Sequence, residues 1–315
     1  MENRSTMNYN FSILEKRIID TLSLSDLHSI REKLMNLKGN TITVGSGGSK
    51  VVSDFASQVL SSINGTICTS LEPRDFLHTN TDAYDNVVIC SNSGRNHGVE
   101  VCSRSKLNRF LLTGGFAEYE GVKSLPYISS ISPEKSFISL GSTMVPMSIL
   151  LGVYNLADSK DVIRHFFEDL NKIDLDYDPQ GKEQYDIFSG IDTKTPETFI
   201  ESTLVESGMG DPVIHHKYDF CHGRSTRLKQ RDSNLIYLIS NPNELDRTIT
   251  QQLRNKNRVV SLEGKYGDPV WNSYFLTLQS MYLMKSIAEH NKKDLSQIDY
   301  DKSMVRKLYG YKGDM

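Results

Sequence analysis

Glycine and serine residues gather in a turn between an apolar run and an amphipathic segment. The β-branched run Thr41–Val44 predicts a buried strand, and the turn Gly45–Ser49 follows it directly. Apolar residues then recur every four positions, which predicts a helix. The backbone N–H groups of Gly47 and Gly48 and the hydroxyl of Ser49 would face an anion at the N-terminus of this helix. The turn therefore predicts a phosphate site.

Two better-known glycine loops do not fit this turn. It lacks the Gly-Lys-Ser/Thr ending of a nucleotide P-loop. The dinucleotide fingerprint requires a glycine where Lys50 stands, and no acidic residue closes the next strand at the usual spacing. We therefore expect no nucleotide cofactor. For the turn alone, an ordinary strand-to-helix connection is the simpler interpretation.

A second polar turn follows the next apolar run. Val87–Cys90 predicts a buried strand, and Ser91, Asn92, Ser93 and Asn96 come after it. Turns at the carboxyl ends of two parallel strands converge on one crevice, so we expect both turns to hold one phosphate. Gly-x-Gly-Gly-Ser after one strand and Ser-x-Ser-Gly after another resembles the sugar isomerase (SIS) family of phosphosugar-binding domains.

The same resemblance extends to possible catalytic residues. In tandem-SIS enzymes, such as the isomerase half of glucosamine-6-phosphate synthase, a helix that ends in glutamate precedes a His-Gly pair. Here Glu206 precedes His222 by 222 − 206 = 16 positions, and Lys302 stands in a similar C-terminal Lys-Ser segment. The resemblance implies that Glu206 moves the proton, His222 opens the sugar ring and Lys302 closes over the substrate.

Elementary chemistry is compatible with these three roles. Moving a proton between adjacent sugar carbons needs a partly desolvated carboxylate, ring opening needs a group that titrates near neutrality, and an ammonium stabilises an enediolate. The alternatives are a solvated glutamate, a structural histidine and a solvated lysine. The chain also departs from the family, because Val205 replaces a frequent lysine and Arg224 follows the His-Gly pair where proline is common.

Apolar runs and helical periodicity alternate along most of the chain. Besides 41–44, strands are expected at 66–71, 86–90, 109–113, 127–129, 185–188, 234–239 and 258–262. Helices are expected at 11–37, 137–156, 161–173, 196–207 and 243–253. This alternation predicts an α/β protein with parallel sheets.

The second half of the chain repeats the first in outline. An acidic, turn-rich segment, Asp174–Gly181, separates them. We expect an N-terminal helical segment at 1–40, a first domain at 41–173 and a second at 182–315. With the resemblance, this implies two SIS-like α/β/α sandwiches with parallel sheets, related by duplication, of which only the first keeps the phosphate site. The C-terminal helix could pack in a dimer interface or in the core, and the core is the simpler interpretation.

Composition narrows the class of protein. The chain has 315 residues, 38% hydrophobic and 24% charged, with a net charge of −3, so neither nucleic acid nor a membrane is an expected partner. Its four cysteines show neither metal-ligand spacing nor a disulfide framework, and no apolar run has membrane-spanning length. We expect a cytoplasmic protein with no metal.

These observations together define the expected function. The resemblance implies a phosphorylated sugar or sugar-amine conjugate as substrate, handled by an aldose–ketose isomerase or a fructosamine-phosphate deglycase, in a homodimer or larger assembly. A non-catalytic phosphosugar-binding regulator is the alternative. Arg224 is further expected at the rim of the reacting end, where it would bind a second anionic group, unless it pairs with Asp219 or Asp211.

Overall fold

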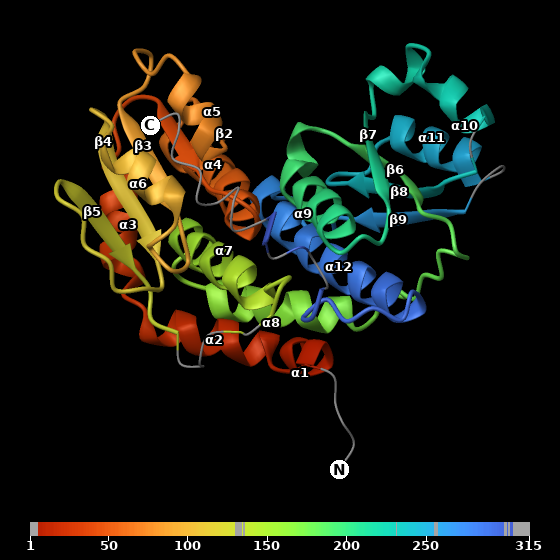
Figure 1. The fold of residues 1–315 in the computed structure, drawn as a ribbon, viewed down its shortest axis with the longest axis horizontal. Helices are drawn as coiled ribbons and strands as arrows, with labels where there is room; N and C mark the ends of the chain where they lie inside the picture. Colours follow the sequence, from red (N-terminus) through yellow and green to blue (C-terminus); the bar gives the residue numbers. More distant parts are fainter. Residues whose placement is uncertain are drawn as a thin grey trace.

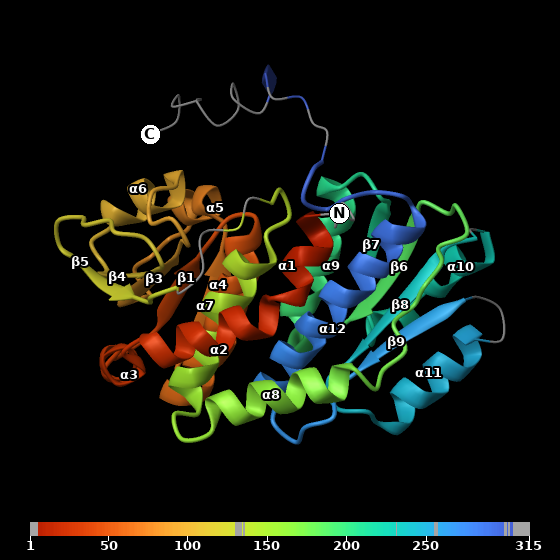
Figure 2. The same cartoon turned by 90° about the horizontal axis from the view of Figure 1, so that it is seen from below.

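A computed structural model describes residues 6–129, 134, 136–230, 232–254, 258–298, 301, 303 and 304. Two parallel sheets, one in each half of the chain, lie on either side of a central group of helices (Figure 1, Figure 2). The expected α/β class and the parallel sheets are confirmed.

The first sheet has five strands in the order β2-β1-β3-β4-β5, all parallel. The side chains of each strand alternate between an inner and an outer layer of helices, which suits strands buried on both faces. The strands are β1 (Thr41–Val44), β2 (Cys68–Leu71), β3 (Asn86–Cys90), β4 (Asn108–Thr113) and β5 (Val122–Pro126). The helices of this half are α4 (Gly48–Asn64), α5 (Pro73–His78), α6 (His97–Ser103), α7 (Leu140–Tyr154) and α8 (Ser159–Leu170).

The second sheet has four parallel strands in the order β7-β6-β8-β9, which matches the order of the first four strands of the first sheet. Its strands are β6 (Gln184–Ser189), β7 (Asp211–His216), β8 (Asn234–Ile239) and β9 (Val259–Glu263). Its helices are α9 (Lys194–Glu206), α10 (Arg227–Gln230), α11 (Glu244–Arg254) and α12 (Pro269–His290), with 3-10 turns at Ile191–Thr193, Asp219–Cys221 and Arg224–Thr226.

One continuous hydrophobic core joins the two halves. It contains the inner face of each sheet and the four helices α4, α7, α9 and α12 between them. Two smaller cores lie on the outer faces, under α5 and α6 in the first half and under α11 in the second. The C-terminal helix α12 is therefore a core element: Tyr274 is fully buried and its hydroxyl lies 2.7 Å from the Ser148 hydroxyl of α7.

Some expected elements differ from the observed ones. The single helix expected at 11–37 is three helices, α1 (Thr6–Ser12), α2 (Leu14–Leu24) and α3 (Leu27–Met35), because the chain turns at Ser25 and Asp26, and Asp26 caps α3. The strand expected at 127–129 is wrong, since β5 ends at Pro126. No strand was expected at β7.

Candidate functional site

The glycine turn connects β1 to α4 with backbone geometry that glycine makes possible. A Cβ atom on Gly45 would lie 2.0 Å from the Ser49 carbonyl oxygen, so the backbone at Gly45 packs directly against the backbone at Ser49. Gly47 has a φ of 56°, in the left-handed region, and precedes the first residue of α4. Gly48 is the first residue of α4 and lies next to Thr143 of α7. The free N–H groups of a 17-residue helix thus begin at this turn.

The serine turn after β3 lies beside the glycine turn, because β1 and β3 are neighbours and Val44 pairs with Ile89. Ser91 is buried, and its hydroxyl oxygen accepts the Gly94 N–H at 3.1 Å. Ser93 is exposed, and among the described residues its hydroxyl donates to no acceptor. The structure therefore brings the two turns to one edge of the sheet, as expected.

Two neighbouring amides support the serine turn. Tyr127 donates its hydroxyl proton to the Asn92 side-chain oxygen at 2.6 Å, which leaves the Asn92 amide protons for another partner. Burial raises the pKa of Tyr127, so the phenol stays protonated as this donor. Asn96 caps α6 by accepting the Val99 N–H at 3.1 Å. The side-chain oxygen of Asn96 is therefore already used by the fold, and its amide protons are left to bind a ligand.

A cavity of about 720 Å³ opens next to the serine turn. Asn92 and Ser93 line it on one side, and the first turn of α7 lines it on another, with Ser139 and Ser142. The glycine turn does not line it but contacts the same end of α7 through Gly48 and Thr143. The first turn of α7 is thus the wall that both turns share.

A carboxylate already lies at the N-terminus of α7. Glu134 accepts the N–H groups of Leu140 at 3.2 Å and Gly141 at 2.6 Å, and Arg17 lies 3.4 Å from it. Arg17 and Glu134 would both clash with a Cβ on Gly141, so glycine makes room for the pair. The N-terminus of α7 therefore already holds a carboxylate of the chain, which accepts two of its N–H groups.

Glu206 is the last residue of α9, and α9 packs along α4. Asp54 of α4 accepts a hydrogen bond from Thr198 of α9 at 2.8 Å and forms an ion pair with Lys50 at 2.5 Å. Thr198 lies two turns before Glu206, and Lys50 lies in the first turn of α4. This contact holds α9 of the second half against the first turns of α4, the helix that begins at the glycine turn (Figure 1).

Glu72 gives independent evidence for this proximity. It follows β2 directly, at the same edge of the sheet as the glycine turn. Burial raises the pKa of Glu72, Lys50 lowers it, and nearby negative charges, including that of Glu206, raise it further. Glu206 itself is exposed and accepts the Ser202 hydroxyl at 2.7 Å. Asp54 and Glu72 are therefore carboxyls of this region that burial removes from water, and the desolvation expected of Glu206 is not met within one chain.

His222 lies elsewhere. It is exposed, in the turns between β7 and α10, which Figure 1 shows at the top of the second half, apart from the first sheet. Among the described residues, no hydrogen bond or ion pair joins His222 to Glu206. Arg224 donates to the Ile214 carbonyl oxygen at 3.0 Å rather than to Asp219 or Asp211. Lys302 lies outside the described residues.

The other two basic residues near His222 are paired with buried acids. The Lys217 ammonium lies 3.3 Å from a carboxylate oxygen of Asp246, and both side chains are buried. Arg227 donates to Asp186 at 2.7 Å, and Asp186 also bonds His215 at 2.6 Å. The charges of Lys217 and Arg227 are therefore neutralised within the fold, so a free cationic cluster around Arg224 is not observed.

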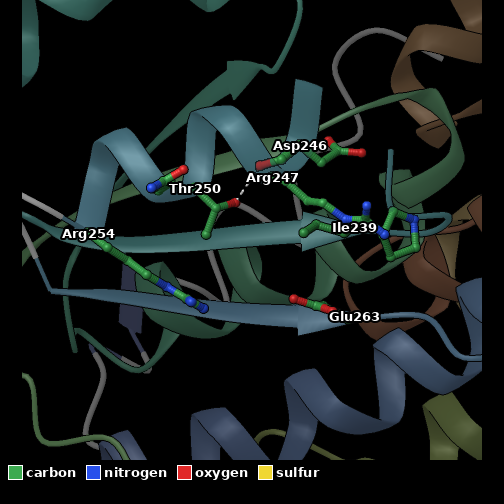
Figure 3. Close-up of a pocket in the computed structure, with 8 residues that line it drawn as sticks. Ile239, Asp246, Arg247, Thr250, Arg254 and Glu263 are labelled. Atoms are coloured by element: carbon green, nitrogen blue, oxygen red, sulfur yellow. Dashed lines mark hydrogen bonds between the residues drawn. The ribbon is translucent and has the colours of Figure 1, made fainter. Parts of the chain in front are cut away.

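The corresponding edge of the second sheet carries acids where the first sheet carries small polar turns. Glu197 is buried and binds Ser189 and Lys194. Asp246 lies in the first turn of α11 and forms an ion pair with Lys217. A groove of about 540 Å³ follows α11 toward β9, and Figure 3 shows Arg247 and Arg254 there together with Glu263. Glu197 and Asp246 at this edge thus already have partners within the fold.

Among the described residues, no group of His, Cys, Asp or Glu side chains could hold a metal ion. Over the same part of the chain, no helix combines the length and the apolar composition that a membrane crossing requires.

Solved structures reveal what this fold resembles. Tagatose-6-phosphate ketose/aldose isomerase from Escherichia coli matches 94% of this chain and 96% of its own, with a TM-score of 0.73 and 15% identity. The C-terminal domain of glucosamine-fructose-6-phosphate aminotransferase from Francisella tularensis matches 94% and 98%, with a TM-score of 0.70 and 13% identity. This chain has their fold. Glucosamine-6-phosphate deaminase from Thermotoga maritima matches 90% and 97%, with a TM-score of 0.65 and 15% identity.

The tandem-SIS resemblance predicted from the two turns is thereby confirmed at the level of the fold. No protein-family model matches this sequence, and no curated protein matches it by sequence. At such low identity, the two turns carry most of the signal that sequence alone offers. The residues that sequence reasoning missed are Asp54, Glu72, Thr143 and the Arg17–Glu134 pair. Only Glu72 had a local signal, because it directly follows a strand.

Proposed function

We propose that this chain binds a phosphorylated sugar in its first half and moves a proton on the open-chain form. The phosphate would lie between the glycine and serine turns, bound by the N–H groups of Gly47 and Gly48 and by the hydroxyls of Ser49 and Ser93. The observation that carries the proposal is the position of Glu206. It is supported by the α4–α9 contact through Asp54, which holds the helix that ends at Glu206 against the helix that begins at the glycine turn.

The proposed chemistry uses Glu206 as a general base. It would remove the proton next to the sugar carbonyl and return it to the neighbouring carbon, which interconverts an aldose and a ketose. With a ketosamine phosphate, the same proton removal gives an enolamine, and water then releases the amine and a sugar phosphate. The enzymes of similar fold are named for sugar-phosphate isomerisation, amino transfer and deamination, which supports this range of substrates.

A homodimer would complete the site. The turns that contain His222 lie apart from the first sheet within one chain (Figure 1), and Glu206 is exposed. We infer that a second copy supplies His222 for ring opening and covers Glu206, which would give the carboxylate the desolvation that proton abstraction requires.

The same separation supports a second candidate function, a non-catalytic phosphosugar-binding regulator. A chain that never brings His222 to Glu206 would still bind phosphate at its two turns. The two candidates differ in turnover but not in binding, so both can be tested with the same variants.

The decisive variant is Glu206→Gln, which keeps size and polarity but removes the proton acceptor. For an enzyme, exchange of a sugar C–H proton with deuterated water should fall by roughly 10²- to 10⁴-fold while affinity stays within a few-fold. Ser93→Ala is the matched control, since it should weaken phosphosugar binding by about ten-fold. Wild-type protein that binds sugar phosphates but exchanges no proton would support the regulator.

Mixed dimers test the shared site. Two inactive variants, Glu206→Gln and His222→Ala, are combined after mild dissociation. In random mixing about half of the dimers are mixed, and each would hold one intact site of two, so about one quarter of wild-type activity should return. A mixture that remains inactive would reject a site built from two copies.

A further inference from the structure

Phe116 stands out among the apolar side chains of the first half. It follows Gly114 and Gly115 in the loop after β4, and its side chain is 97% exposed. It also lines the 720 Å³ cavity that holds Asn92 and Ser93. We propose that Phe116 is a specificity residue that packs against the sugar of a ligand whose phosphate is bound at the serine turn. This inference rests on the proposed function.

The loop of Phe116 is fastened to the serine turn. Gly114 donates its N–H to the Asn92 carbonyl oxygen at 3.2 Å, and Tyr119 donates its hydroxyl to the Gly94 carbonyl oxygen at 3.0 Å. A Cβ atom on Gly115 would lie 2.3 Å from the Ser93 carbonyl oxygen. The two backbones are therefore in contact, and Phe116 keeps a fixed place relative to Ser93 without burying its own ring.

Polar and apolar side chains line the cavity, together with the charged pair Arg17 and Glu134. Asn92 and Ser93 are polar, and so are Ser139 and Ser142 on α7. Phe116 and Ile128 are apolar, and Ile128 is 57% exposed. A volume of about 720 Å³ lies in the range of small-ligand sites, which combine apolar walls with a few placed polar groups.

A sugar phosphate matches this combination of polar and apolar lining residues. Its phosphate needs hydrogen-bond donors, while the C–H groups on one face of its ring offer an apolar surface to the flat face of a phenyl ring. Because Phe116 is one residue from Gly115, which lies against Ser93, we expect its ring to contact the sugar attached to the phosphate. The proposal therefore makes different predictions for inorganic phosphate and for a hexose phosphate.

Calorimetric titrations with inorganic phosphate and with glucose 6-phosphate provide the test. Phe116→Ser should weaken glucose 6-phosphate by about 3- to 10-fold and leave inorganic phosphate unchanged, while Phe116→Tyr should bind both as wild type does. Ile191→Ser is the matched control, because Ile191 is 93% exposed in the second half, away from the cavity. It should change neither affinity.

Other outcomes separate this inference from the function it rests on. If wild-type protein binds neither probe, or if Ser93→Ala leaves both affinities unchanged, the phosphate site itself is rejected, and this inference with it. Equal losses for both probes in Phe116→Ser would mean that Phe116 only shapes the serine turn, which overturns this inference alone. If Phe116→Ser leaves both affinities unchanged but its dimer dissociates in analytical ultracentrifugation, Phe116 contacts a second copy of the chain. That result would also overturn this inference.

Discussion

Replacing Asp54 by alanine should cost more stability than any surface ion pair could. Asp54 is 4% exposed and Lys50 is 16% exposed in their side chains, and Asp54 also accepts the Thr198 hydroxyl. Removing one member of a buried pair leaves its partner as an uncompensated charge, at a cost of about 3–5 kcal/mol. Because Lys50 keeps some contact with water, we expect the lower end, about 3 kcal/mol, with about 1 kcal/mol of it from Thr198.

Urea unfolding of three variants measures this value. Asp54→Ala should lose about 3 kcal/mol and Thr198→Val about 1 kcal/mol. The double variant should be no worse than Asp54→Ala, since the Thr198 bond is already lost there. Glu289→Ala is the control, because Glu289 forms an i,i+4 pair with Lys285 at 3.4 Å on a more exposed surface and should lose less than about 0.5 kcal/mol.

The same experiment could refute the structural reasoning. An Asp54→Ala variant no less stable than Glu289→Ala would show that Asp54 does not bridge the two halves. Simple additivity of Asp54→Ala and Thr198→Val would show that the two side chains do not interact. Either result would also remove the main support for Glu206 lying near the glycine turn.

Three further predictions concern single residues. Gly45→Ala should abolish phosphate binding and destabilise the chain by about 1–3 kcal/mol, because its Cβ would meet the Ser49 carbonyl oxygen; titration and urea unfolding measure both effects. Tyr274→Phe should cost about 1 kcal/mol in urea unfolding, since Ser148 keeps its bond to a backbone oxygen. Burial alone would raise the pKa of Asp186, but its hydrogen bonds hold it below its ordinary value. On acidification the unfolded chain therefore binds a proton at Asp186 at a higher pH than the folded chain does, so the stability present above about pH 4 should fall as the pH decreases. Urea midpoints measured across pH should fall less steeply for Asp186→Asn than for the wild-type protein.

The sequence was informative where the signal was local. Thr41–Val44, the glycine turn and the helix after it are contiguous, and β8 was predicted at its observed bounds because Asn234–Ile239 is one apolar run. Two edge strands were not found. β7 contains Pro212, His215 and His216, and β5 contains Lys123, so neither shows the apolar run of a central strand.

The parts of the site that depend on tertiary contacts were not predictable in the same way. Asp54 and Thr198 are 144 positions apart, and nothing in either neighbourhood marks them as partners. The pairing of Lys217 with Asp246 likewise follows from how β7 and α11 meet at one sheet edge, which no spacing along the chain encodes. Sequence reasoning thus found the turns but not the bonds that place them.

The core that runs without interruption from one sheet to the other has a consequence for how the protein folds and evolves. A half expressed alone would leave the apolar faces of its central helices in water, so we expect neither half to fold alone. Unfolding should therefore proceed as a single cooperative event, and a destabilising change near one sheet should be felt at the other. Exchange of one half for that of a distant homologue would have to repack α4, α7, α9 and α12 together.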